Sequence, residues 1–455
     1  MRLPVEGVDF LLNEKRFSAV LFTRICFVFV LICLYLSACS PQTGHDGEAP
    51  SASPAGSTPP VESGLPVGRT ASPTKEPTPT KEPVPTVDPD RPYKEVLESM
   101  TADEKLGQLL IVGCLNNEEA SQMIRNHKIG GAVLFSENFE TFDQLVQITK
   151  QWKEYNEGNP LPLWIAMDEE GGTVSRLPAG KTPVPGARVV GSHEDVRLTK
   201  STGTVIGREL AAAGANLDFA PVVDIVDNPE NQFMLKRSYG STPDMVSGHA
   251  TAFLEGLRET GIRGCAKHFP GHGGTVVDSH KDMPVIPTSL EEWKRKDAVP
   301  FQTMIDAGVD MIMVGHLSYP NIDPSGLPAS MSSVFLREQL RDRMGYQGLI
   351  ITDAIDMKGY PQGEERKEAV VTSFLAGVDL FAIGYGQDIQ LDVLEALKTG
   401  METGRITEER IDASVMRIIK AKAGLADVPE YSLEEAKKIF GSKENRDAVS
   451  ALLGN

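Results

Sequence analysis

Asp278 and His280 have the types and spacing of a proton-transfer pair. They lie two positions apart, so an extended backbone would point both side chains to one face. A carboxylate beside an imidazole can hold the ring in one tautomer, and the ring can then act as a general acid or base. The glycine-rich run before the pair, residues 271–274, allows the chain to turn sharply and approach a ligand closely. This loop therefore predicts the active site of an enzyme.

Asp353 is the second reactive candidate, because it directly follows the expected strand Leu349-Ile350-Ile351-Thr352. An aspartate at the rigid end of a strand can attack an anomeric carbon or stabilise an oxocarbenium ion. One carboxylate nucleophile with His280 as a separate acid and base indicates glycoside cleavage by double displacement, with retention of configuration.

Short β-rich runs alternate with helical stretches from residue 91 onward, which predicts an α/β fold, a single (β/α)8 TIM-type barrel. A doubly wound open sheet is the competing fold, but no G-x-G-x-x-G motif follows the first strand. Helical spacing is found at 244–260 and 364–376, the second ending at Gly377, and one more helix is expected at 432–440. The eight expected strands are 108–113, 132–135, 163–167, 216–222, 263–267, 310–314, 349–352 and 379–383.

Chemistry in such a barrel lies where strands end and the following loops begin. Ionisable residues follow five successive strands, from the third to the seventh, and they include Asp168, Asp224, Lys267, His316 and Asp353. We expect five of these strand-end and loop residues to hydrogen-bond sugar hydroxyls: Asp168, Arg176, Arg237, Lys267 and His268. Glu169 and Glu170 are interpreted as a charged turn, and Asp356 as a residue that complements a helix dipole.

Five short motifs together resemble the family 3 glycoside hydrolases. They are K-H-F-P-G-H-G at 267–273, D-S-H at 278–280, I-I-T-D-A at 350–354, D-E-E-G-G at 168–172 and G-G-A-V-L-F at 130–135. Their combination fits the β-N-acetylglucosaminidase (β-N-acetylhexosaminidase) branch, which uses an Asp-His pair where other branches use a Glu on a second domain. The resemblance extends from about residue 92 to about residue 425.

The resemblance implies that Asp353 is the nucleophile and His280 the acid and base, with Asp278 tuning the imidazole. The same five residues named above become the sugar-binding set, and no cofactor or metal is implied. The expected reaction is exo-cleavage of N-acetylglucosamine (GlcNAc) from peptidoglycan-derived muropeptides or chitooligosaccharides. One position departs from the related loops, which read G-H-G-D-T, because Gly274 stands where they carry the aspartate. That change spares the Asp-His pair.

Three alternatives to a glycosidase that uses Asp353 and His280 remain open. The first is a glycoside phosphorylase, because an imidazole acid and base repels incoming phosphate less than a carboxylate does. The second is a non-catalytic lipoprotein that binds wall sugars. The third is a metal-dependent hydrolase that uses the loop histidines, although the loop lacks the i, i+4 spacing of H-E-x-x-H.

The N-terminal region predicts export and a lipid anchor. The apolar run 25–36 follows Lys15, Arg16 and Arg24 and is too short to span a bilayer core of about 30 Å, so it fits a signal peptide. It ends in Leu36-Ser37-Ala38-Cys39, which resembles a bacterial lipobox. We therefore expect a lipoprotein signal peptide at 1–38, lipidation of Cys39, and an extracytoplasmic protein anchored to the bacterial cell membrane.

Composition divides the rest of the chain. Residues 39–90 are rich in Pro and Thr and nearly free of large apolar side chains, which predicts a disordered tether. The barrel domain is expected at 91–427, and a C-terminal helix and tail at 428–455. A net charge of −18 argues against a nucleic-acid partner, so the expected partners are a carbohydrate substrate and, through the anchor, the membrane. We expect a monomer in which Cys114 and Cys265 are buried free thiols.

Overall fold

The computed structural model describes residues 88–279, 281–425 and 428–453, which form an α/β barrel of eight parallel strands. Neighbouring strands follow the sequence from β1 to β7, and β8 pairs with β1. A parallel bridge between Ile351 and Leu380 joins β7 to the start of β8 and closes the ring. The predicted (β/α)8 barrel is confirmed. The strands are β1 Leu110–Gly113, β2 Gly131–Val133, β3 Trp164–Met167, β4 Leu217–Asp218, β5 Arg263–Phe269, β6 Met311–Val314, β7 Leu349–Thr352 and β8 Phe381–Ile383.

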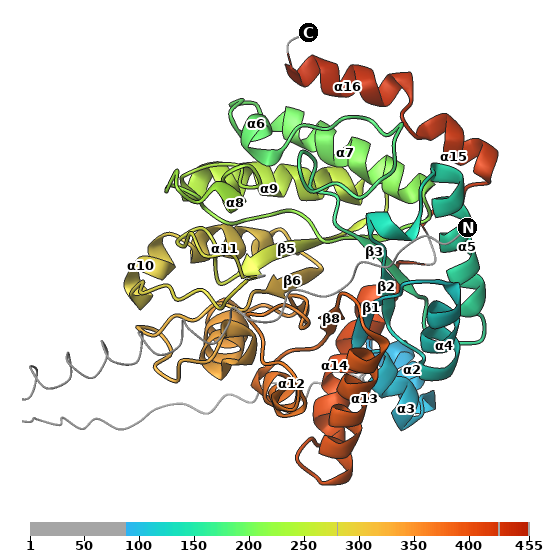
Figure 1. Cartoon of the computed structure of the whole chain (residues 1–455), viewed down its shortest axis with the longest axis vertical. Helices are drawn as coiled ribbons and strands as arrows, with labels where there is room; N and C mark the ends of the chain where they lie inside the picture. The colour runs from blue at the N-terminus through green and yellow to red at the C-terminus, as the bar shows by residue number, and fades with distance from the viewer. Residues whose placement is uncertain (1–87, 280, 426–427, 454–455) are drawn as a thin grey trace, which may run out of the picture. The chain divides into compact units, whose positions relative to one another are not determined.

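Helices surround the strands, with α7 and α9 on one side and α12, α13 and α14 on the opposite side (Figure 1). The helices are α2 Arg91–Ser99, α3 Ala102–Gly107, α4 Asn117–His127, α5 Phe142–Tyr155, α6 Ala187–Gly191, α7 Val196–Ala212, α8 Gln232–Leu235, α9 Pro243–Arg258, α10 Leu290–Arg295, α11 Ala298–Asp306, α12 Glu365–Ala376, α13 Gln387–Glu402, α14 Glu408–Lys422, α15 Leu433–Ile439 and α16 Lys443–Leu453. A π-helix, Val334–Arg343, lies between β6 and β7, and short 3-10 turns occupy Ser136–Asn138 and Ala329–Met331.

The apolar pattern explains why these elements form. All residues of β1 and β7 are buried, as expected for parallel strands covered on the outside by helices and on the inside by packed side chains. The predicted apolar face of α9 is buried from Val246 to Leu257, and Thr242 caps its first turn. Gly377 has a φ of 136° and ends α12, as its position predicted. Cys114 and Cys265 are buried and free, also as predicted.

Two strands differ from the expected bounds in a way that matters for the site. β4 ends at Asp218, although the next residues still bond to both neighbouring strands: Phe219 N donates to Met167 O at 2.8 Å, and Ala220 O accepts from Cys265 N at 2.8 Å. A bridge between Val222 and Lys267 then continues the pairing with β5. β5 extends to Phe269, so Lys267 and His268 belong to the strand itself and not to the following loop. Both side chains are therefore positioned by the barrel wall.

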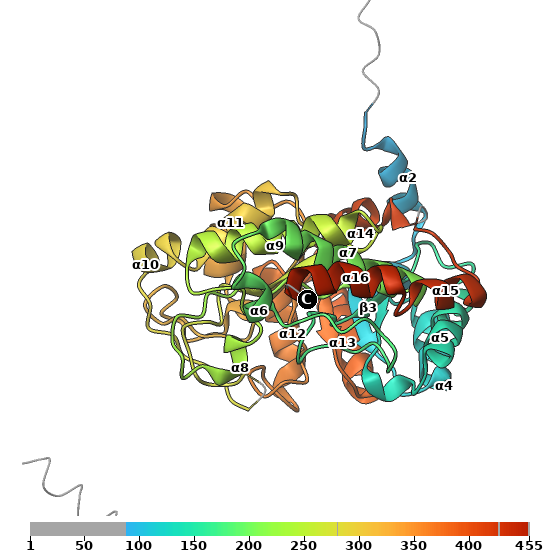
Figure 2. The same ribbon diagram turned by 90° about the horizontal axis from the view of Figure 1, so that it is seen from above.

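The C-terminal segment packs on the barrel through α7. Figure 1 shows α16 alongside α7, and both α15 and α16 contact α7, although these elements are far apart in the sequence (Figures 1 and 2). The buried carboxylate of Glu209 on α7 accepts hydrogen bonds from Gly441 N at 2.9 Å and from Asn445 Nδ2 at 3.2 Å. It also accepts from the Thr182 hydroxyl at 2.6 Å, and Thr182 lies in the loop after β3. The sequence predicted α15 but not α16.

Several predictions concern residues outside the described part of the chain. These are the signal peptide at 1–38, lipidation of Cys39, the tether up to residue 87, and the position of His280. Across residues 88–279, 281–425 and 428–453, no helix combines the length and apolar character needed to cross a membrane.

Candidate active site

A cavity of about 300 Å³ lies at the carboxyl ends of the strands. Asp353 and all five predicted sugar-binding residues line it: Asp168, Arg176, Arg237, Lys267 and His268. The remaining wall is mostly apolar and includes Phe135, Phe219, Phe233, Met313 and Met357. The structure therefore brings together six residues that the sequence assigned to one site from four different strand ends.

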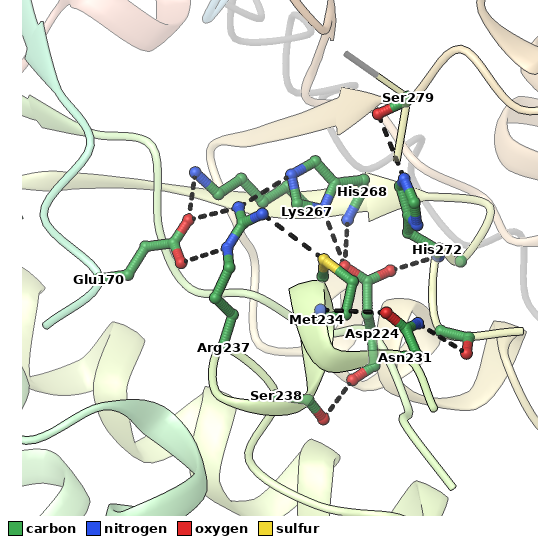
Figure 3. A network of polar contacts seen from close by, with 12 residues as sticks. Glu170, Asp224, Asn231, Met234, Arg237, Ser238, Lys267, His268, His272 and Ser279 are labelled. Atoms are coloured by element: carbon green, nitrogen blue, oxygen red, sulfur yellow. Dashed lines mark hydrogen bonds and ion pairs between the residues drawn. The ribbon is translucent and has the colours of Figure 1, made fainter. Parts of the chain in front are cut away.

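Glu170, in the loop after β3, holds both Lys267 and Arg237 (Figure 3). Lys267 Nζ lies 2.7 Å from Asp168 Oδ1 and 2.8 Å from Glu170 Oε1. Arg237 binds Glu170 with two hydrogen bonds of 2.8 Å, from Nε to Oε2 and from Nη2 to Oε1. This bidentate pair fixes the plane of the guanidinium group.

The buried pairs remain charged. Burial opposes ionisation of Glu170, but Lys267 and Arg237 outweigh it and hold the pKa of its carboxyl well below the usual range. Burial likewise opposes the charge on Lys267, but Asp168 and Glu170 raise its pKa above the usual value. The cavity therefore has fixed cationic donors and fixed anionic acceptors, which suits the hydroxyl groups of a sugar.

Asp224, which follows β4, orients the histidine end of the site (Figure 3). Its Oδ2 lies 2.8 Å from His268 Nδ1, and its Oδ1 accepts from the backbone N–H of His272 at 2.6 Å. Burial favours the neutral acid, but His268 outweighs it, so the pKa of Asp224 is lowered. A carboxylate can only accept, so Nδ1 of His268 donates this hydrogen bond. Nε2 of His268 lies 3.4 Å from Arg237 Nη2.

Asp353 is half-buried at the end of β7. Its backbone N–H donates to Val314 O at 2.8 Å, and its Oδ1 accepts from the N–H of Ala354 at 2.8 Å. These bonds anchor the residue while its carboxylate contributes to the cavity wall. The position fits the nucleophile of the predicted reaction.

Asp278 does not line the cavity, and its predicted partner His280 lies outside the described residues, so this pair stays a prediction. Asp278 is half-buried, and its Oδ2 lies 3.7 Å from Lys281 Nζ. Its backbone carbonyl accepts from the N–H groups of Lys281 and Asp282. The segment therefore turns at Asp278, whereas the spacing argument assumed an extended backbone.

The interpretation of Glu169 and Glu170 as a charged turn is wrong. Glu170 forms the ion pairs described above, and Glu169 is buried. Glu169 Oε2 accepts from the backbone N–H of Arg176 at 2.7 Å, which holds the loop that presents the Arg176 side chain. Their position directly after a buried strand was the available signal, as it was for Asp168.

The interpretation of Asp356 is also wrong, because no helix of the described residues begins there. Its Oδ1 accepts from the backbone N–H of Gly384 at 2.6 Å, so it ties the loop after β7 to the end of β8. Within the described part of the chain, no three His, Cys, Asp or Glu side chains are placed to share a metal ion.

Comparison with known proteins identifies the family. Residues 101–421 match the glycosyl hydrolase family 3 N-terminal domain, and the chain belongs to this family. It is 34% identical over 352 residues to β-hexosaminidase A of Pseudoalteromonas piscicida, covering 72% of this chain but only 58% of that enzyme. It is also 34% identical to β-hexosaminidase LpqI of Mycobacterium tuberculosis, covering 70% of this chain and 82% of the relative.

A solved structure shows the same similarity in three dimensions. The family 3 β-N-acetylglucosaminidase of Paenibacillus sp. str. FPU-7 superposes with a TM-score of 0.75 at 34% sequence identity. The match covers 78% of this chain and 68% of that one. The family assignment implied by the five sequence motifs is confirmed.

Proposed function

We propose that this chain is a retaining exo-β-N-acetylglucosaminidase that hydrolyses terminal β-linked GlcNAc from peptidoglycan fragments or chitooligosaccharides. The observation that carries the proposal is the shared cavity, which Asp353 lines together with the five candidate sugar-binding residues. Its volume of about 300 Å³ lies at the small end of ligand sites, which suits one terminal sugar. The names of the relatives, β-hexosaminidase and β-N-acetylglucosaminidase, support the same sugar class.

The proposed reaction proceeds by two displacements. The Asp353 carboxylate attacks the anomeric carbon and forms a covalent glycosyl ester while the glycosidic C–O bond breaks. The leaving oxygen takes a proton from the imidazolium of His280. A water molecule then gives its proton to the neutral imidazole and attacks the anomeric carbon, which releases the sugar and regenerates the Asp353 carboxylate.

The sugar is held by groups that are already oriented. Lys267 and Arg237 cannot leave their carboxylate partners without exposing buried charge, so their remaining N–H groups are preorganised donors. Asp168 offers acceptor oxygens on the same wall. A ligand that lacks matching hydroxyls would leave these buried groups unpaired, which favours selection of one sugar.

The test is release of an aryl alcohol from an aryl β-GlcNAc glycoside by the purified full-length chain. We expect turnover by the wild type and its loss in Asp353→Asn. The matched control is Asp356→Asn, whose amide oxygen can still accept from Gly384 N. Activity of Asp353→Asn equal to that of the control would remove Asp353 from the proposed role.

The same assay separates the alternatives. Turnover that requires phosphate and yields a sugar 1-phosphate would indicate a phosphorylase. Loss of turnover on chelation would indicate a metal-dependent hydrolase, and GlcNAc binding without turnover would indicate a non-catalytic wall-binding protein.

We also propose that the protein is extracytoplasmic and anchored by lipid on Cys39, because the lipobox-like sequence precedes a tether-like stretch. We propose in addition that it is a monomer. Metabolic labelling with a radioactive fatty acid should mark the wild type and not Cys39→Ser. Absence of label from the wild type would contradict the anchor. A dimeric mass in light scattering of the detergent-solubilised chain would contradict the monomer.

A further inference from the structure

His316 has no role in the chemistry proposed above, although it lies beside the proposed nucleophile. It follows β6 and is fully buried, and its ring packs against Tyr360 with centroids 4.9 Å apart. Both ring nitrogens have partners: Nδ1 lies 2.8 Å from Ser330 Oγ, and Nε2 lies 3.2 Å from Ala354 O.

These partners determine the tautomer of His316. A backbone carbonyl can only accept, so Nε2 must carry the proton that is donated to Ala354 O. In the neutral ring Nδ1 is then an acceptor for the hydroxyl of Ser330. Burial lowers the pKa of His316 more than the neighbouring Asp353 raises it, so the ring is neutral near pH 7. It is a fixed donor and not a proton-transfer group.

The hydrogen bond from His316 to Ala354 O restrains the residue that directly follows Asp353. The N–H of Ala354 donates to Asp353 Oδ1 at 2.8 Å, and the N–H of Asp353 itself donates to Val314 O at 2.8 Å. Val314 and His316 both belong to the end of β6 and its continuation. The main chain on either side of Asp353 is therefore anchored to the same neighbouring strand end.

His316 also packs against the loop that follows Asp353. Gly359, in the loop after β7, donates from its N–H to Ser279 O at 3.2 Å. A Cβ added at Gly359 would lie 3.0 Å from His316 Cβ and 3.2 Å from Ser279 O. The loop that follows Asp353 is thus packed between His316 and the segment that carries Asp278.

We propose that His316 is a positioning residue that holds the carbonyl of Ala354 and thereby fixes the Asp353 carboxylate for attack on the anomeric carbon. This inference rests on the proposed function, because it assigns a support to the proposed nucleophile. Misplacement of a reacting group by about 1 Å can cost about 100-fold in rate. Loss of this support should therefore lower kcat much more than it raises KM.

The experiment compares His316→Leu, His316→Gln and Ser330→Ala with the wild type on an aryl β-GlcNAc glycoside. We expect His316→Leu to lose about 100-fold in kcat, with little change in KM. An amide N–H can replace Nε2–H, so His316→Gln should recover much of this loss, and Ser330→Ala should fall between them. The pH dependence of kcat/KM should keep its shape in His316→Gln, because the ring neither gives nor takes a proton.

The tautomer provides a readout that does not depend on turnover. Nitrogen-15 NMR of histidine-labelled protein at pH 7 should show one buried, neutral ring protonated at Nε2, and this signal should be absent from His316→Gln. A ring protonated at Nδ1 would overturn the proposal. A folded His316→Leu variant with the kcat of the wild type would also overturn it. So would the loss of one limb of the pH profile of kcat/KM in His316→Gln.

The outcomes also separate this inference from the proposed function. If the wild type turns over the glycoside and Asp353→Asn does not, a normal kcat in His316→Leu rejects only the positioning role. If the wild type has no glycosidase activity, the proposed function and this inference both fail. Should His316→Leu not fold, His316→Gln and Ser330→Ala still decide between these outcomes.

Discussion

Arg237 and Glu170 form a buried bidentate ion pair in which both N···O distances are 2.8 Å. Lys267 adds a second cation 2.8 Å from the same carboxylate. One glutamate thus balances two buried positive charges on a wall of the cavity. Removal of its charge should affect both the fold and the binding of substrate.

For Glu170→Gln we therefore expect a loss of about 3 kcal/mol in the free energy of unfolding, because breaking a buried pair leaves uncompensated charge. KM for the aryl glycoside should rise as well, since Arg237 and Lys267 lose a fixed partner. Urea denaturation and steady-state kinetics measure the two effects. Glu338→Gln, at an exposed position on the π-helix, is the control and should match the wild type. Equal stability of the two variants would contradict this account.

Asp297 should make stability depend on pH. It is buried beside the glycine-rich loop, and a Cβ added at Gly271 would lie 3.0 Å from its Cβ. Burial raises the pKa of Asp297 to about 7, whereas the unfolded value is about 3.9. The folded chain therefore keeps a proton that the unfolded chain releases, so this contribution to stability is complete below about pH 4 and is lost as pH rises through 7.

Asp297→Asn should remove a decline of at most about 1.4 kcal/mol per pH unit between pH 5 and pH 7. Urea denaturation at several pH values would measure this difference, with the exposed Asp342→Asn as the matched control. A wild-type decline that persists unchanged in Asp297→Asn would assign it to another group.

Neighbouring glycines of the catalytic loop should respond differently to alanine. A Cβ at Gly273 would lie 1.7 Å from Ile225 O, so the backbone must move, whereas a Cβ at Gly274 would meet only Ile286 Cγ2 at 3.4 Å. We expect Gly273→Ala to lose about 1–3 kcal/mol of stability and to lose activity, as overpacked sites do. Gly274→Ala should be nearly neutral in thermal denaturation and in turnover. Equal tolerance of both substitutions would show that the loop does not need this close approach.

The C-terminal helices should depend on Glu209. Glu209→Ala leaves the buried donors of Thr182, Gly441 and Asn445 without their acceptor, which should cost about 3 kcal/mol or more. Limited proteolysis should then cut first between α14 and α16. The control is Glu444→Gln, which removes a surface ion pair with Arg208. The side chain of Glu444 is 76% exposed, so this change should have little effect. Indistinguishable digestion of the two variants would contradict the role of Glu209.

The barrel and the members of its site could be predicted because both signals are local in the sequence. The run 349–352 is buried on all sides and is apolar except for Thr352, and an aspartate directly after it must lie at the strand end. The sugar-binding candidates Lys267 and His268 follow the same logic, although they belong to β5 itself.

The pairing of the polar residues could not be predicted in this way. Glu170 and Arg237 are 67 positions apart, and Asp224 and His268 are 44 apart, so only the closed ring brings them together. A charged pair such as Glu169-Glu170 looks the same in a solvated turn and in a buried network. Asp356 was assigned to a helix because the sequence does not show that the end of β8 lies beside it.

The join between β7 and β8 is short, and it lies next to Asp353. Besides the bridge from Ile351 to Leu380, the N–H of Thr352 donates to Leu380 O at 3.0 Å. A sugar bound between Asp353 and Gly384 would contact residues that follow both strands and would stabilise the pairing of β7 with β8. Ligand binding should therefore slow hydrogen exchange of the Thr352 amide and its neighbours, so that exchange at the β7–β8 pairing also reports whether the site is occupied.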